Sequence, residues 1–182
     1  MKSTHIALAA AALAVSAFGP VRAGAEGLIY ELKAGVLAHD VPDLWSRFRR
    51  ETTAVDINID AQLSPSMQAF FGTIRPAIGA SINTGGQTSI GYIDARYTYG
   101  GPTGWFFSTG LGGAIHDGNI DRRDPDRKAL GSRVLFHIPI ELGYRLDAHN
   151  SISGYFEHTS NGYTQRFNEG MDRLGIRYGY RF

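Results

Sequence analysis

The 182-residue sequence contains no cysteine, almost no net charge and no apolar run of the ~20 residues that a transmembrane helix needs. The lack of cysteine excludes disulfides and thiolate metal sites. The formal net charge of +1 gives no reason to expect a nucleic-acid partner. Segments with helical periodicity are scarce, whereas 23 glycines and 12% aromatic residues are typical of an all-β chain with many turns.

The first residues have the layout of a secretory signal peptide. A lysine near the start precedes an alanine-rich apolar stretch, residues 6–19, and small residues follow at Ala23 and Ala25. A positive start, a short apolar centre and small residues at the exit are the three parts of such a signal. We therefore predict that residues 1–23 are a signal peptide, cleaved after Ala23 or Ala25, and that residues 24–182 form one mature domain.

Polar and apolar residues of the mature chain alternate with a period of two, which is the pattern of a strand with two different faces. In residues 54–63, AVDINIDAQL, apolar residues alternate with aspartate, asparagine, aspartate and glutamine. In residues 172–182, arginines and glycines alternate with leucine, isoleucine, tyrosine and phenylalanine. The predicted strands cover residues 28–39, 54–63, 74–83, 89–99, 105–116, 132–146, 151–160 and 172–182.

Two architectures accommodate such strands: a soluble β-sandwich with its apolar faces inside, and an outer-membrane β-barrel with its apolar face outside. The export signal, the aromatic residues near strand ends and strand lengths close to the ~9–11 residues that cross a bilayer favour the barrel. The last strand ends on Phe182, with Tyr178 and Tyr180 on the same face, and resembles the terminal strand that the outer-membrane assembly machinery recognises. We predict an all-β fold, an eight-stranded antiparallel up-and-down transmembrane β-barrel in the cell outer membrane, with that machinery as a partner.

The polar faces of the strands predict a lumen filled with charge. Eight strands leave a lumen just wide enough to be packed with side chains, and isolated buried charges are costly, so the charged residues must pair with one another. The charged residues expected in the lumen are Asp56, Asp60, Arg75, Asp94, Arg96, Arg133, Glu141, Glu157, Arg173, Arg177 and Arg181.

The stretch YFEHTSNGY carries the candidate chemistry. His158 and Ser160 are two residues apart and share the apolar, membrane-facing side of their strand, near its outer-leaflet end. Asp172 has the same outward register in the next strand. A serine needs a base to take its proton, and a histidine needs a carboxylate on its other nitrogen, so the three residues suit a hydrolytic triad. Asn161 and the backbone amides of the stretch NGY, which includes Gly162, are candidates for an oxyanion hole.

These residues resemble a known family. HTSNG, followed by NEGMD and an aromatic terminal strand, is similar to the lipid A 3-O-deacylases of the PagL type, which are eight-stranded outer-membrane barrels. The resemblance implies that Ser160 is the nucleophile, His158 the general base and Asn161 an oxyanion-hole contributor, acting on the acyl ester at position 3 of lipid A without a metal or cofactor. The family commonly has glutamate where this chain has Asp172, which is shorter by one methylene, or ~1.5 Å. Glu169 is the alternative acid.

Two other functions stay open at this point. A phospholipase would keep the triad and change the substrate; outer-membrane phospholipase A shares the His-x-Ser-Asn-Gly motif but is a larger barrel. A non-enzymatic structural or adhesive barrel would not need Ser160, since a His-x-Ser pair alone is common by chance. The cost of presenting polar side chains to a bilayer favours the catalytic interpretation. A homodimer through the apolar wall also stays open.

Overall fold

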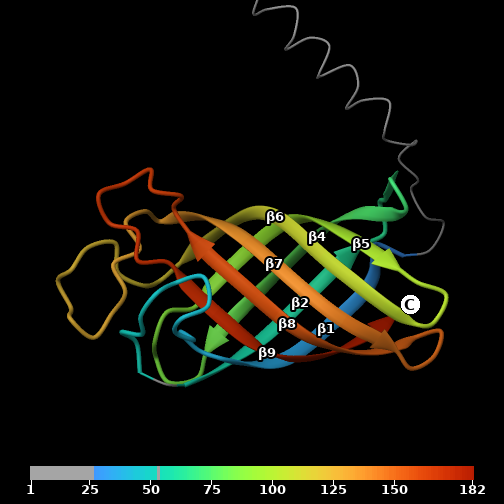
Figure 1. Cartoon of the computed structure of the whole chain (residues 1–182), viewed down its shortest axis with the longest axis horizontal. Helices are drawn as coiled ribbons and strands as arrows, with labels where there is room; N and C mark the ends of the chain where they lie inside the picture. The colour runs from blue at the N-terminus through green and yellow to red at the C-terminus, as the bar shows by residue number, and fades with distance from the viewer. Residues whose placement is uncertain (1–26, 53) are drawn as a thin grey trace, which may run out of the picture.

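The alternating segments of the sequence become the strands of one continuous sheet (Figure 1). The computed structural model describes residues 27–52 and 54–182, so the predicted signal peptide, residues 1–23, lies outside the described residues. The strands are β1 (Ile29–Ala38), β2 (Val55–Leu63), β3 (Met67–Ala69), β4 (Gly72–Asn83), β5 (Ile90–Gly100), β6 (Trp105–His116), β7 (Val134–Arg145), β8 (Asn150–Ser160) and β9 (Met171–Arg181).

The sheet closes on itself. Neighbouring strands pair antiparallel, β1 pairs with both β2 and β9, and β2 also pairs with β4. The three-residue β3 pairs with β4 alone and lies within the segment expected to be a connection, so the barrel wall consists of β1, β2 and β4 to β9. The predicted eight-stranded barrel is confirmed, and the β-sandwich alternative is wrong because the strands of the described residues form a single sheet that closes on itself.

The apolar residues of each strand face outward and the polar residues face the lumen. In β2, Ile57 and Ile59 are 38% and 48% exposed, whereas Asp56 and Asp60 are fully buried. This is the reverse of a soluble core, and it leaves an apolar outer wall suited to lipid. Within the described residues, no helix is both long enough and apolar enough to cross a membrane.

Ion pairs fill the lumen, as expected for most of the charged residues. Arg96 contacts Asp94 at 2.8 Å and Asp60 at 3.2 Å, and Arg177 contacts Glu141 at 2.7 Å. Arg173 pairs with Asp56, and Lys33 joins Glu141 at 2.9 Å. Guanidinium and carboxylate groups that are fully desolvated together compensate for each other's lost hydration.

Three arginines depart from that expectation. Arg75, Arg133 and Arg181 lie near the two ends of the barrel rather than in its closed centre, and none of them makes an ion pair with a carboxylate among the described residues. Arg75 and Arg181 are partly exposed, and Arg133 is exposed. The prediction that they pair in the lumen is wrong, because the ends of the barrel are open to water and do not force desolvated charges together.

The two ends of the barrel differ (Figure 1). Short turns join the strands at one end, and at the other end lie outer loops 1 (residues 39–54), 2 (84–89), 3 (117–133) and 4 (161–170). The outer loops are tied together. Glu51 of loop 1 accepts hydrogen bonds from Thr88 N at 2.9 Å and Lys128 N at 3.2 Å, and Glu169 of loop 4 accepts one from Ala129 N at 2.8 Å. The loops therefore form one hydrogen-bonded cap at the end where β8 finishes.

Candidate active site

The pairing of β8 with β9 brings the predicted triad together. His158 lies directly opposite Asp172 in the antiparallel register. Opposite residues of neighbouring strands have Cβ atoms ~5 Å apart, which suits a direct side-chain contact. Ser160 follows His158 on the same face, which is the outward face of β8, since Ile152 in the same register is 49% exposed while Glu157 is fully buried in the lumen.

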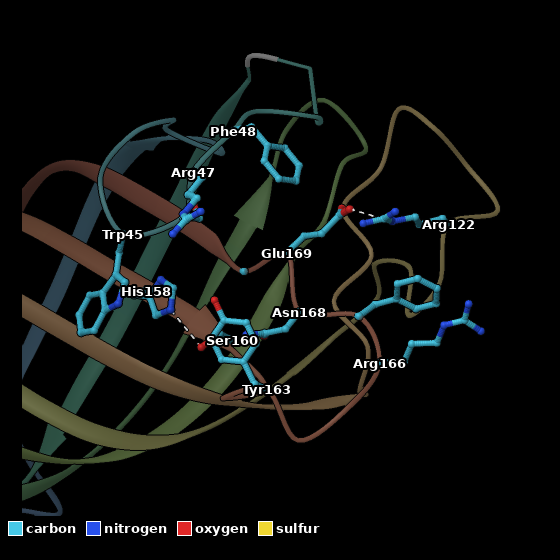
Figure 2. Close-up of a pocket in the computed structure, with 13 residues that line it drawn as sticks. Trp45, Arg47, Phe48, Arg122, His158, Ser160, Tyr163, Arg166, Asn168 and Glu169 are labelled. Atoms are coloured by element: carbon cyan, nitrogen blue, oxygen red, sulfur yellow. Dashed lines mark hydrogen bonds and ion pairs between the residues drawn. The ribbon is translucent and has the colours of Figure 1, made fainter.

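A chain of two hydrogen bonds runs through the three side chains. Nδ1 of His158 lies 2.6 Å from Oδ1 of Asp172, and Nε2 lies 3.0 Å from Oγ of Ser160. Figure 2 shows the serine hydroxyl directed at the imidazole. With the proton on Nδ1 donated to the carboxylate, Nε2 is left with the lone pair that can accept the proton of the hydroxyl.

The shorter carboxylate of Asp172 reaches its partners without difficulty. The side chain is fully buried, and besides His158 it accepts hydrogen bonds at Oδ2 from the backbone N–H groups of Trp45, at 2.6 Å, and Ser46, at 2.5 Å. Outer loop 1 thus folds down over the wall and fills the space beside the aspartate. Three donors to one carboxylate hold it charged and in a single orientation.

Outer loop 1 also covers the imidazole. The indole of Trp45 stacks on His158, with ring centroids 4.6 Å apart and an interplanar angle of 14°. It continues over Phe156, at 6.4 Å and 6°. His158 is consequently only 6% exposed although it points out of the barrel. The sequence reasoning missed Trp45 and Ser46, because no local pattern indicates that a loop more than a hundred residues earlier in the chain returns to this strand pair.

The residues predicted for the oxyanion hole lie where β8 passes into outer loop 4. Both hydrogens of the Asn161 amide are engaged, since Nδ2 donates to the carbonyl oxygens of Leu130, at 2.8 Å, and Phe167, at 2.5 Å. Its backbone N–H donates to Oδ1 of Asn168 at 2.9 Å. Asn161 therefore anchors loops 3 and 4 in this conformation. Gly162 has a φ of +62°, a backbone shape that glycine adopts readily.

Two glutamates of the outer loops hold the cap rather than the triad. Glu169, the alternative acid, accepts hydrogen bonds from Ala129 N and from the side chains of Arg50, at 3.0 Å, and Arg122, at 3.2 Å, so its carboxylate is occupied away from His158 (Figure 2). Burial raises the pKa of Glu51, but hydrogen bonds from His39, Thr88 and Lys128 lower that pKa to about 2.

The serine opens into a pocket between outer loops 1, 3 and 4. The pocket has a volume of about 360 Å³, and its walls include Ser160, His158 and three arginines, Arg47, Arg122 and Arg166 (Figure 2). A shallow depression beside Trp45 is lined by Leu44, Phe156 and Leu174, and by one acidic residue, Asp43. The described residues contain no group of three or more histidine, aspartate or glutamate side chains placed to hold a metal ion.

Comparison with known proteins gives one matching family and several similar solved structures. A family model described as Lipid A 3-O-deacylase (PagL) matches residues 43–181. None of the curated proteins matches the chain. A crystal structure of the outer membrane enzyme PagL aligns with a TM-score of 0.63 at 18% identity, covering 84% of this chain and 99% of that one. The outer membrane protein Ail of Yersinia pestis aligns with a TM-score of 0.51 at 9% identity, covering 86% of this chain and 100% of that one. Neisserial surface protein A aligns with a TM-score of 0.50 at 10% identity, covering 86% and 100%. At these identities the structural likeness supports the barrel fold.

Proposed function

The chain belongs to the lipid A 3-O-deacylase (PagL) family and lies in the cell outer membrane, and on this premise we propose that it is a serine esterase that removes the acyl chain linked to position 3 of lipid A. The observation that carries the proposal is the hydrogen-bonded chain of Ser160, His158 and Asp172 on the outward face of the wall. An ester in the outer leaflet meets this face directly.

The reaction follows from the two hydrogen bonds. Ser160 Oγ attacks the ester carbonyl carbon while His158 Nε2 takes the hydroxyl proton, and Asp172 stabilises the imidazolium. The bond between the acyl carbon and the sugar oxygen then breaks, and the imidazolium returns its proton to that oxygen. Water attacks the acyl-serine with His158 again as the base, which releases the fatty acid and restores the hydroxyl.

The oxyanion of the tetrahedral intermediate needs donors beside Ser160. We assign this role to the backbone N–H of Gly162, where the chain turns into outer loop 4. The amide of Asn161 supports it by fixing that loop to two carbonyl oxygens. A direct contribution of the Asn161 side chain requires its amide to leave one of those carbonyls, so we keep this role as a prediction.

The surroundings of the serine favour lipid A over a glycerophospholipid. Arg47, Arg122 and Arg166 line the pocket together with one carboxylate, Glu169, which Arg122 contacts at 3.2 Å. The arginines outnumber the carboxylate, and arginine is suited to the phosphate groups of an anionic sugar headgroup. The depression beside Trp45, in which Leu44, Phe156 and Leu174 outnumber the single acidic residue Asp43, offers a mainly apolar surface for the acyl chain. A bulky, doubly phosphorylated headgroup uses several arginines at once, whereas a phospholipid carries one phosphate. A phospholipase is therefore the second candidate.

One experiment tests the proposal. The wild type, Ser160→Ala and the control Ser132→Ala are produced in the outer membrane of a host that lacks lipid A deacylation, and lipid A is analysed by mass spectrometry. Ser132 is a control because it lies at the same end of the barrel and its hydroxyl accepts a hydrogen bond from the backbone N–H of Val134 at 3.2 Å. We expect loss of one 3-hydroxyacyl group with the wild type and Ser132→Ala, and none with Ser160→Ala. Free fatty acids from phospholipids with intact lipid A would establish the phospholipase instead, and no change in either lipid would leave the structural barrel.

A further inference from the structure

The end of the barrel opposite the candidate active site holds a second pocket, which the proposed function does not use. It has a volume of about 250 Å³ and is lined by residues of β1, β2, β4, β5, β7 and β9 at the end with the short turns. This end faces the periplasm in outer-membrane barrels. Arg75, Arg145 and Arg181 line the pocket together with a single carboxylate, Glu31.

The charge of this pocket is not balanced by the protein. Oε2 of Glu31 lies 3.7 Å from Nζ of Lys33, and Oε1 of Glu31 accepts a hydrogen bond from the hydroxyl of Ser151 at 3.3 Å. No ion pair joins any of the three arginines to a carboxylate within residues 27–52 and 54–182. The centre of the lumen is different, because Arg96 and Arg177 each contact carboxylates there. Three like charges around one pocket repel one another unless an anion enters.

The arginines are nevertheless held in place. The ring of Tyr30 lies under two guanidinium groups, with its centroid 3.7 Å from Cζ of Arg75 and 4.9 Å from Cζ of Arg181. Arg75 also donates to the carbonyl oxygen of Ser64 at 2.6 Å. The Nε atoms of Arg145 and Arg181 are buried and have no acceptor among the described residues. Arg96, Arg173 and Arg177 in the lumen centre also have one guanidinium nitrogen without an acceptor, but each of them contacts a carboxylate. What distinguishes the pocket is therefore that its arginines are held in place without a carboxylate partner.

We propose that Arg75, Arg145 and Arg181 bind a phosphate group at the periplasmic mouth of the barrel. The guanidinium fork matches two phosphate oxygens, and three forks around one pocket match a group with several negative oxygens. The pocket is large enough for a phosphate together with part of the group that it is attached to. Two sources offer this chemistry at the periplasmic face: free phosphate, and the phosphodiester headgroup of an anionic phospholipid in the inner leaflet.

The test uses the full chain folded in detergent micelles without phosphate. Inorganic phosphate is titrated at constant ionic strength by calorimetry, and retention of phosphatidylglycerol is measured by native mass spectrometry. The double variant Arg145→Gln/Arg181→Gln is compared with Arg123→Gln/Arg127→Gln, which removes the same charge from outer loop 3 at the other end. We expect about a tenfold loss of phosphate affinity for each pocket arginine removed, since a hydrogen bond to a charged group contributes roughly that factor, and no change in the control.

The outcomes separate the two sources and decide the proposal. Phosphate binding without phosphatidylglycerol retention assigns the site to the free anion, and retention that the double variant alone loses assigns it to the lipid headgroup. A wild type that binds neither, or a double variant that binds both as well as the control does, overturns the proposal. Folding of each variant is checked by its heat-dependent gel mobility. If the double variant does not fold, Arg145→Lys keeps the charge without the fork, and wild-type phosphate affinity in that variant rejects the site.

Discussion

Replacing Asp172 by asparagine tests whether the triad needs a carboxylate that accepts hydrogen bonds at both of its oxygens. The carboxylate accepts from His158 at one oxygen and from the backbone N–H groups of Trp45 and Ser46 at the other. Asparagine has one oxygen and one NH₂ group, so one of these two sides must lose its acceptor.

The number of hydrogen bonds lost in each orientation of the asparagine amide decides which orientation is preferred. Turning the NH₂ toward outer loop 1 gives up two hydrogen bonds to a charged acceptor, a cost of about 3–6 kcal/mol, whereas turning it toward His158 gives up one, about 1.5–3 kcal/mol. The NH₂ therefore faces Nδ1 and donates to it. The imidazole then carries its own proton on Nε2, where it can no longer accept the proton of Ser160. We expect kcat to fall by about 10⁴-fold, equivalent to about 5.5 kcal/mol.

The assay measures release of the 3-hydroxy fatty acid from purified lipid A in detergent by mass spectrometry. Emission from Trp45 in a Trp105→Phe background reports whether outer loop 1 stays in place, since these are the two tryptophans of the chain. Asp126→Asn, an exposed position in outer loop 3, is the control for loss of one carboxylate. An Asp172→Asn variant with unchanged emission that retains more than about a tenth of the wild-type rate would refute the assignment of the acid, since that residual rate corresponds to less than about 1.4 kcal/mol.

Three further predictions concern the residues around the triad. Trp45→Ala removes the ring stacked on His158, so we expect a rate about 2 to 12 times lower, from the 0.5–1.5 kcal/mol of an aromatic pair; Trp105→Ala, at the other end, should match the wild type in the same assay. Gly170 has a φ of +61°, and an added Cβ would lie 3.3 Å from Cε1 of His158. Gly170→Ala should therefore lower both the rate of acyl release and the thermal unfolding midpoint, and an unchanged rate would contradict this packing. Glu51 has its pKa lowered to about 2 by the hydrogen bonds that outweigh burial, so its contribution to the stability of the cap is present above about pH 4.3, the unfolded value, and is lost as the pH falls toward 2. Protease cleavage of the outer loops should rise over that window in the wild type, and Glu51→Gln should be cleaved readily at every pH.

Strand positions could be read from the sequence because side chains of a strand alternate between two environments. A strand such as residues 54–63 shows its two faces directly, and the bounds of all the predicted barrel strands lie within two residues of the observed bounds. The short β3 was missed because three residues carry too little periodicity to detect. The pairing of most lumen charges was also predictable, since a closed small barrel desolvates them together. The arginines at its mouths are exceptions because water reaches them.

The candidate site was predictable in part for the same reason. His158 and Ser160 are two residues apart on one strand, so their shared face follows from strand geometry, and the antiparallel order of the last two strands made Asp172 a reasonable partner. Outer loop 1 was not predictable, because its contact with Asp172 joins residues 127 positions apart through a loop without periodicity. The use of Asn161 as a loop anchor depends on carbonyl groups of Leu130 and Phe167 that no motif announces.

The sequence by itself determined the strands, the direction that each residue faces and the presence of a serine and a histidine on the membrane side, because these depend on spacing along one strand. The tertiary structure decided which carboxylate meets the imidazole, what shields it and where unpaired arginines gather. Those outcomes depend on the register between strands and on the path of the loops, and both are set by the packing of segments far apart in the chain.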